Sequence, residues 1–94
     1  MATIGVLTLE IVLQNSHSLK DKRHVVKSLK DRLRGKFNVA VAEIDCQDLW
    51  QRAVVAAVTV SADHTFAEKV LQSVEEEAAA LLGSELTGAT VEWM

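Results

Sequence analysis

Apolar and polar residues alternate near the start of the chain, in the segment IGVLTLEIVL at residues 4–13. A period of two divides these positions between the two sides of an extended segment: Leu7, Leu9, Ile11 and Leu13 on one, and Val6, Thr8, Glu10 and Val12 on the other. This pattern predicts a half-buried β-strand.

The next segment has the spacing of an amphipathic helix, which we expect to begin after Ser18 and to end at Gly35. Ser18 and Asp21, three residues later, resemble a capping box, and glycine is favoured where a helix ends in a left-handed residue. At about 100° per residue, one arc collects the apolar side chains that we expect to be buried: Leu19, Val25, Val26, Leu29 and Leu33.

The rest of the chain supplies four more expected elements. Segments 37–44 and 52–61 are rich in valine and alanine and are separated by DCQDLWQ, so they predict two strands of a hairpin. A second helix is expected from Ser61 or Asp63 to Gly83, followed by a last strand at 85–93. The order βαββαβ predicts an α+β, ferredoxin-like domain spanning residues 1–94, with both helices on one face of an antiparallel sheet of strand order 4-1-3-2.

Composition narrows the class of protein. The chain has 94 residues, of which 49% are hydrophobic and 24% charged, as expected for one folded domain. Cys46 is the only cysteine, so no internal disulfide is possible. No apolar run approaches the roughly 20 residues of a membrane span, and the N-terminal segment lacks the basic region of a signal peptide. We therefore expect a cytoplasmic protein that does not associate with membranes.

Several strings in the sequence resemble a known family. They are IGVL near the start, SLKDKR at the expected first helix, FNVAVAE in the second strand, and D-x-QDLWQRA through the hairpin. Together they resemble the YlxP-like family of small bacterial proteins, a domain of unknown function. The resemblance implies a ferredoxin-like fold and, from the transcription and translation factors that usually accompany the family in genomes, an association with RNA or the ribosome. It implies no catalytic residues.

Positive charge is concentrated in the expected first helix. Eight of the ten Lys and Arg residues lie between positions 20 and 36, against two acidic residues, so this segment carries +6 and the rest of the chain −9. The cations opposite the apolar stripe suit contacts to nucleic-acid phosphates: Lys20, Arg23, Lys27, Lys30 and Arg34. We expect Lys22 and Lys36 to lie on the surface near these phosphate contacts.

A competing interpretation is that the basic helix is solvated or paired internally. The second helix carries Glu68 and the triplet Glu75–Glu77, and the two helices of this fold lie side by side. Charged helix faces are common, and exposed ion pairs stabilise proteins little. The sequence leaves both interpretations open.

The aromatic residues argue against RNA recognition by the sheet. The expected central strands, at 4–13 and 52–61, contain none of them, although a sheet that stacks bases would place aromatic side chains there. The aromatic residues are Phe37, Trp50, Phe66 and Trp93. Any RNA contact is therefore expected from the first helix and the adjoining loops.

Other candidate sites are weaker. Trp50 either packs the hairpin loop onto the core, which we favour, or is an exposed anchor for a partner. Glu43, Asp45 and Asp48 offer oxygen ligands for a divalent cation, but acidic residues are also common in turns. Cys46 and the dispersed histidines form no recognisable catalytic pair. We expect no metal, no cofactor, no small-molecule substrate and no enzymatic activity.

The leading hypothesis is a non-enzymatic module that associates with RNA or a ribosomal subunit through its basic first helix. The alternative is a protein-interaction or self-assembly domain, such as a homodimer, because Val6 and Val12 place apolar side chains on the outer face of the sheet. A small-molecule sensor of the ACT type shares the order of elements, by fold analogy alone.

Overall fold

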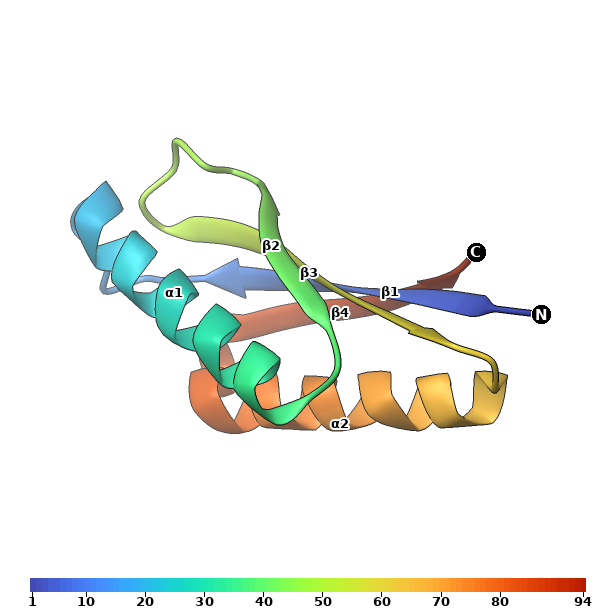
Figure 1. Ribbon diagram of the computed structural model, residues 1–94. Helices are drawn as coiled ribbons and strands as arrows, with labels where there is room; N and C mark the ends of the chain where they lie inside the picture. The colour runs from blue at the N-terminus through green and yellow to red at the C-terminus, as the bar shows by residue number, and fades with distance from the viewer.

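A computed structural model describes all residues from 1 to 94 (Figure 1). The chain runs through β1 (Thr3–Val12), α1 (Leu19–Lys36), β2 (Ala40–Asp45) and β3 (Arg52–Ser61). It continues through α2 (His64–Leu82), a short 3-10 turn (Gly83–Glu85) and β4 (Leu86–Trp93). The predicted βαββαβ order is confirmed.

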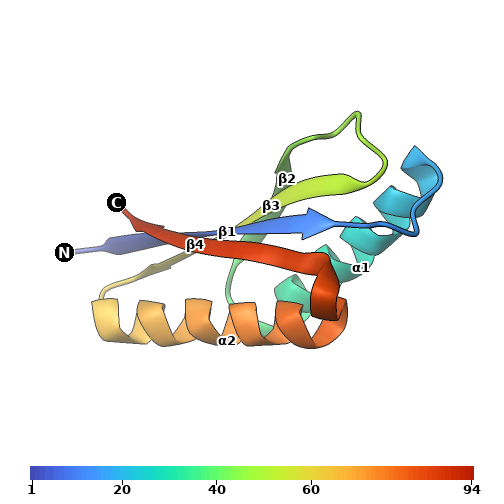
Figure 2. The same ribbon diagram turned by 180° about the vertical axis from the view of Figure 1, so that it is seen from behind.

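The four strands form one antiparallel sheet in the order β2-β3-β1-β4. This is the predicted order 4-1-3-2 counted from the opposite edge. Both helices lie on the same side of the sheet, α2 beneath its length and α1 toward the hairpin end, as the two opposite views show (Figures 1 and 2). The other face of the sheet is not covered by any element. Neither helix is long and apolar enough to cross a membrane.

The helix starts agree with the capping residues in the sequence. The Ser18 hydroxyl accepts a hydrogen bond from the backbone N–H of Asp21 at 3.0 Å, and the Asp63 carboxylate accepts bonds from Thr65 and Phe66. Gly83 ends α2 with a φ of 58°, the left-handed region in which glycine meets no steric penalty.

The expectation that Gly35 stops the first helix is wrong. α1 continues through Gly35 to Lys36, and Gly35 does not have a positive φ. The helix ends when Phe37 becomes extended, while the Phe37 N–H still donates to the Leu33 carbonyl. The Phe37 side chain packs against the core, and the chain leaves the helix toward β2.

The core lies between the sheet and the helices. The leucine-rich side of the first strand is at most 2% exposed: Leu7, Leu9, Ile11 and Leu13. It packs against Leu29 and Leu33 of α1 and Leu71 and Val74 of α2. The buried stripe of α1 differs from the prediction, because Leu19 and Val25 are only half-buried. The stripe instead consists of Lys22, Val26, Leu29 and Leu33.

Candidate nucleic-acid interface

A hollow of about 360 Å³ lies alongside α1, on the flank that faces β2. Four of the five predicted phosphate-binding residues line it: Arg23, Lys27, Lys30 and Arg34. Val26 and Asp31 of α1 and Glu43 of β2 complete the lining. We call this hollow the basic groove. Its cations recur every three or four residues, so successive turns of one helix present them on a common side.

Asp31 is the acidic residue of α1 that borders the basic groove. Its carboxylate lies 2.7 Å from Lys27 Nζ and 3.8 Å from the Arg34 guanidinium. The hydrogen bond from Lys27, helped by the nearby charges of Arg34 and Lys30, holds the pKa of Asp31 below its usual value. Arg23 and Lys30 make no ion pair. The groove therefore retains two unpaired cations and two that share one carboxylate.

The opposite flank of α1 faces α2, and there the predicted internal pairing does occur. Glu77 of α2 accepts from Lys36 Nζ at 2.9 Å and from Arg32 at 3.3 Å. The Lys36 bond, with the charge of Arg32 close by, holds the pKa of Glu77 below its usual value. Pairing across the helices thus engages Arg32 and Lys36, and none of the five predicted phosphate-binding residues.

The remaining members of the basic set lie elsewhere. Lys20 is exposed and unpaired in the first turn of α1, but it does not line the groove. Lys22 is not a surface residue at all, since its side chain is 1% exposed. The expectation that Lys22 lies among the surface cations is therefore wrong. The spacing of Lys22 from Val26, Leu29 and Leu33 is the sequence signal that places it in the buried stripe.

Hydrogen bonds from the Lys22 ammonium connect α1 to the loop between β2 and β3. Its ammonium donates to the backbone carbonyls of Cys46 at 2.6 Å, Gln47 at 3.2 Å and Arg52 at 3.3 Å. Glu43 Oε2 lies 3.0 Å from the same nitrogen. An ammonium has three protons, and the three carbonyls use them, so Glu43 Oε2 is buried beside the charge without a hydrogen bond of its own.

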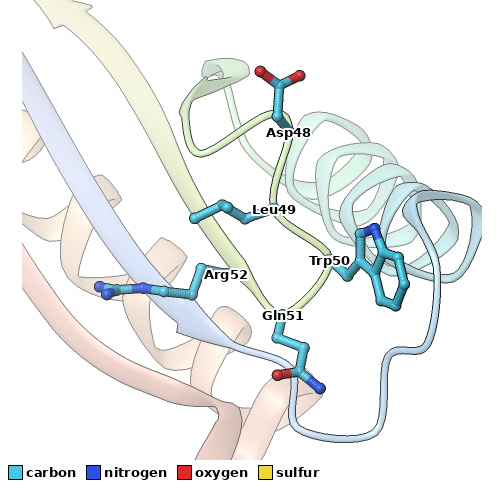
Figure 3. A pocket seen from close by; sticks show the side chains of 5 residues that line it. All are labelled: Asp48, Leu49, Trp50, Gln51 and Arg52. Atoms are coloured by element: carbon cyan, nitrogen blue, oxygen red, sulfur yellow. The ribbon is translucent and has the colours of Figure 1, made fainter.

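The carbonyls of Cys46 and Gln47 accept from Lys22. The side chains of residues 48–52 leave the loop in different directions (Figure 3), and Gln51 Nε2 donates to the carbonyls of Gln14 and Ser16 at 3.4 Å. Asp48, Leu49, Trp50, Gln51 and Arg52 surround a second hollow of about 420 Å³. The favoured interpretation that Trp50 packs onto the core is wrong, because the residue is 53% exposed and Leu49 is 48% exposed. Lys22 already occupies the space beneath the loop.

The acidic residues of the hairpin do not gather into a metal centre. Glu43 is engaged by Lys22, and Asp45 accepts from the N–H of Cys46 at 2.8 Å, where the chain adopts a φ of 63°. No group of three or more His, Cys, Asp or Glu side chains is close enough to hold a metal ion. His64 packs instead on Trp93, with ring centroids 4.2 Å apart.

The arrangement of strands and helices defines a ferredoxin-like domain, and solved structures support this. The de novo designed protein Foldit4 superposes with a TM-score of 0.61 at 12% identity, covering 100% of this chain and 97% of the design. The de novo designed protein LFR1 1, described as having a ferredoxin fold, superposes with a TM-score of 0.50 at 15% identity, covering 100% and 84%. At these identities the likeness concerns the fold alone.

Sequence comparison identifies the family. The chain belongs to the family described as protein of unknown function (DUF503), whose model matches residues 4–91. The uncharacterized protein YlxP of Bacillus subtilis (strain 168) is 41% identical over 71 residues, which are 76% of this chain and 77% of that protein. The resemblance to YlxP-like proteins is thereby confirmed.

Proposed function

We propose that this protein is a non-enzymatic RNA-associated module that holds the phosphates of an RNA strand in the basic groove. One observation carries the proposal. Arg23, Lys27, Lys30 and Arg34 line a single hollow, while Arg32 and Lys36 pair with Glu77 on the other flank of the same helix. Four of the five α1 cations that do not pair with Glu77 and are not buried are therefore gathered on one side, and Lys20 lies outside the groove.

The dimensions and charge of the groove suit several phosphates. From Arg23 to Arg34 the helix rises about 16 Å, at 1.5 Å per residue. Four cations and Asp31 give a net charge of about +3, because Glu43 is balanced by Lys22. A groove of this kind binds backbone phosphates without reading the bases. We therefore expect affinity that depends strongly on salt and weakly on sequence.

Two further features favour RNA held by the helix flank. β1 and β3 contain no aromatic residue, so the sheet lacks a platform on which bases stack. The groove is lined by Arg, Lys, Asp and Glu side chains and a valine, without a nucleophile beside a general base, which fits binding and not catalysis. The choice of RNA, including ribosomal RNA, over DNA rests on the resemblance to YlxP-like proteins.

The proposal is tested by measuring the binding of a fluorescently labelled single-stranded RNA by anisotropy, beginning at about 50 mM salt. About three neutralised phosphates give a slope of log affinity against log salt near −2. The test variant is Arg23→Gln with Lys30→Gln, since neither residue makes an ion pair. We expect this variant to lose two contacts and to flatten the slope to about −0.7.

The matched control is Arg32→Gln with Lys36→Gln, which removes the same charge from the flank that faces α2. We expect this control to retain most of the RNA affinity. Equal losses in both variants, or a wild-type protein that binds neither RNA nor ribosomal particles at about 50 mM salt, would overturn the proposal. Binding of a DNA strand of the same length shows whether the 2′-hydroxyl of RNA contributes to affinity. We expect the protein to bind DNA more weakly than RNA. Equal affinities would mean that the protein binds phosphates in general.

A further inference from the structure

The sheet face opposite α1 and α2 is not covered by any helix (Figures 1 and 2). In the strand register, residues that lie opposite one another share a face, such as Val6 with Val58 and Thr8 with Ala56. Apart from Glu10 and Arg52, the positions of this open face on β1, β3 and β2 carry no charge: Ile4, Val6, Thr8 and Val12 of β1, Val54, Ala56, Val58 and Val60 of β3, and Ala40 and Ala42 of β2. On the edge strand β4, Thr90 lies opposite Thr8 and the charged Glu92 lies opposite Val6. Val60 is 58% exposed and Ile4 is 40% exposed.

Two opposite charges stand at the hairpin end of the open face. Glu10 lies opposite Val54, and Arg52 lies opposite Val12, so the two residues are on adjacent strands and two positions apart. Neither makes an ion pair within the chain. Figure 3 shows Arg52 projecting away from Trp50, toward the side of β1. The face thus offers both a positive and a negative group to a partner.

We propose that the open face binds a second copy of this chain, face to face, about a two-fold axis that runs along the strands between β1 and β3. This rotation lays β1 of each copy over β3 of the other and keeps the hairpin ends together. Arg52 of each copy then lies above Val12 of the other, within reach of the partner's Glu10. The two unpaired charges become two reciprocal ion pairs.

The area of the face is sufficient for a weak dimer. β1 and β3 have ten residues each, about 33 Å, and four strands span about 15 Å. The face therefore covers about 500 Å² per copy, or about 1,000 Å² in total, near the lower limit for a specific interface. An area of about 500 Å² lies within the range of the largest apolar patch on a typical monomer, and such a patch is often functional. We expect a dimer that dissociates on dilution through the micromolar range.

This inference is independent of the RNA proposal, because the basic groove lies on the helix side and the open face lies on the other. A face-to-face dimer leaves both grooves exposed. Each proposal has its own assay, and failure of one leaves the other standing.

The test is analytical ultracentrifugation of the purified chain between about 10 and about 300 µM. We expect the wild-type protein to shift from monomer to dimer across this range. Val58→Asp places a charge at the centre of the face and should give a monomer throughout. The matched control is Phe66→Asp on the exposed side of α2, where the residue is 59% exposed, and it should still dimerise. Circular dichroism verifies that both variants are folded.

The orientation is tested by exchanging the two charges. Arg52→Glu alone should weaken the dimer at least about tenfold, because two like-charged pairs then face each other. Glu10→Arg combined with Arg52→Glu should restore the dissociation constant to within about threefold of wild type. A wild-type monomer at the highest concentration, dimers of the Val58→Asp variant, or no restoration in the exchanged variant would each overturn the proposed interface. A different protein recovered on the open face of a monomeric chain would identify another occupant and would also overturn it.

Discussion

Replacing Lys22 with methionine tests how the hairpin loop is held to α1. Methionine matches the length of the lysine stem, so the packing of the buried stripe is kept and only the ammonium is lost. Three carbonyls then lose their donor, and Glu43 loses the charge that lies 3.0 Å from its buried oxygen.

The magnitude follows from these contacts. Removing one partner of a buried ion pair costs about 3–5 kcal/mol, and a hydrogen bond to a charged group contributes about 1.5–3 kcal/mol. Two of the three Lys22 bonds are long, and Glu43 is 16% exposed, so water relieves part of the loss. We expect the free energy of unfolding to fall by about 2–4 kcal/mol, which lowers the Tm of a domain this size by about 10–25 °C.

Urea and thermal unfolding followed by circular dichroism measure this change. Lys20→Met is the control, because Lys20 is exposed and unpaired, and it should change the free energy of unfolding by less than about 0.5 kcal/mol. Lys22→Met with Glu43→Met should recover at least about half of the lost free energy of unfolding, because the double variant no longer buries an unpaired carboxylate. A Lys22→Met variant within about 0.5 kcal/mol of wild type would refute the account of the loop.

Three other expectations concern stability and binding. Gly35→Ala should raise the free energy of unfolding by about 0.5–1 kcal/mol in urea melts, because Gly35 is helical and nothing lies within 4 Å of an added methyl group. Asp31→Asn should tighten RNA binding about three- to tenfold at low salt, since it releases two groove cations. The pKa of Glu77 lies below its usual 4.5, so its pairing stabilises the fold above that pH and is lost on acidification. The stability deficit of Arg32→Gln with Lys36→Gln should therefore shrink as urea melts are taken from pH 7 to below 4.5.

The element order was predictable because the boundaries of the elements depend on local signals, and the strand order followed from it because crossover connections are right-handed. The family was recognisable from strings such as SLKDKR. Each element or boundary is marked by a few neighbouring residues: the strand by alternation in residues 4–13, the helix starts by the caps at Ser18 and Asp63, and the end of the second helix by Gly83. Gly35 misled the prediction because glycine only permits a left-handed residue. The neighbouring backbone, with Phe37 drawn to the core, determined where the helix ended.

The candidate site was predictable in part. Four of the five cations share the groove because their helical phase is set by the sequence alone. Lys22 and Trp50 were misplaced because their positions depend on a loop with no periodic signal. A lysine is buried only when enough acceptors surround it, and here three of those acceptors are carbonyls of residues 46, 47 and 52, far along the chain. No composition or spacing reveals backbone acceptors of this kind.

The helical phase also explains why one basic helix has two different charged flanks. The buried stripe occupies positions 22, 26, 29 and 33. Adding one to each number gives 23, 27, 30 and 34, which are the groove cations beside β2. Subtracting one from the last three gives 25, 28 and 32, the flank on which Val25 and Ser28 border α2 and Arg32 meets Glu77. Two residues along α1, about 200° of rotation, therefore separate a cation that pairs with Glu77 of α2 from a cation that remains available to a ligand.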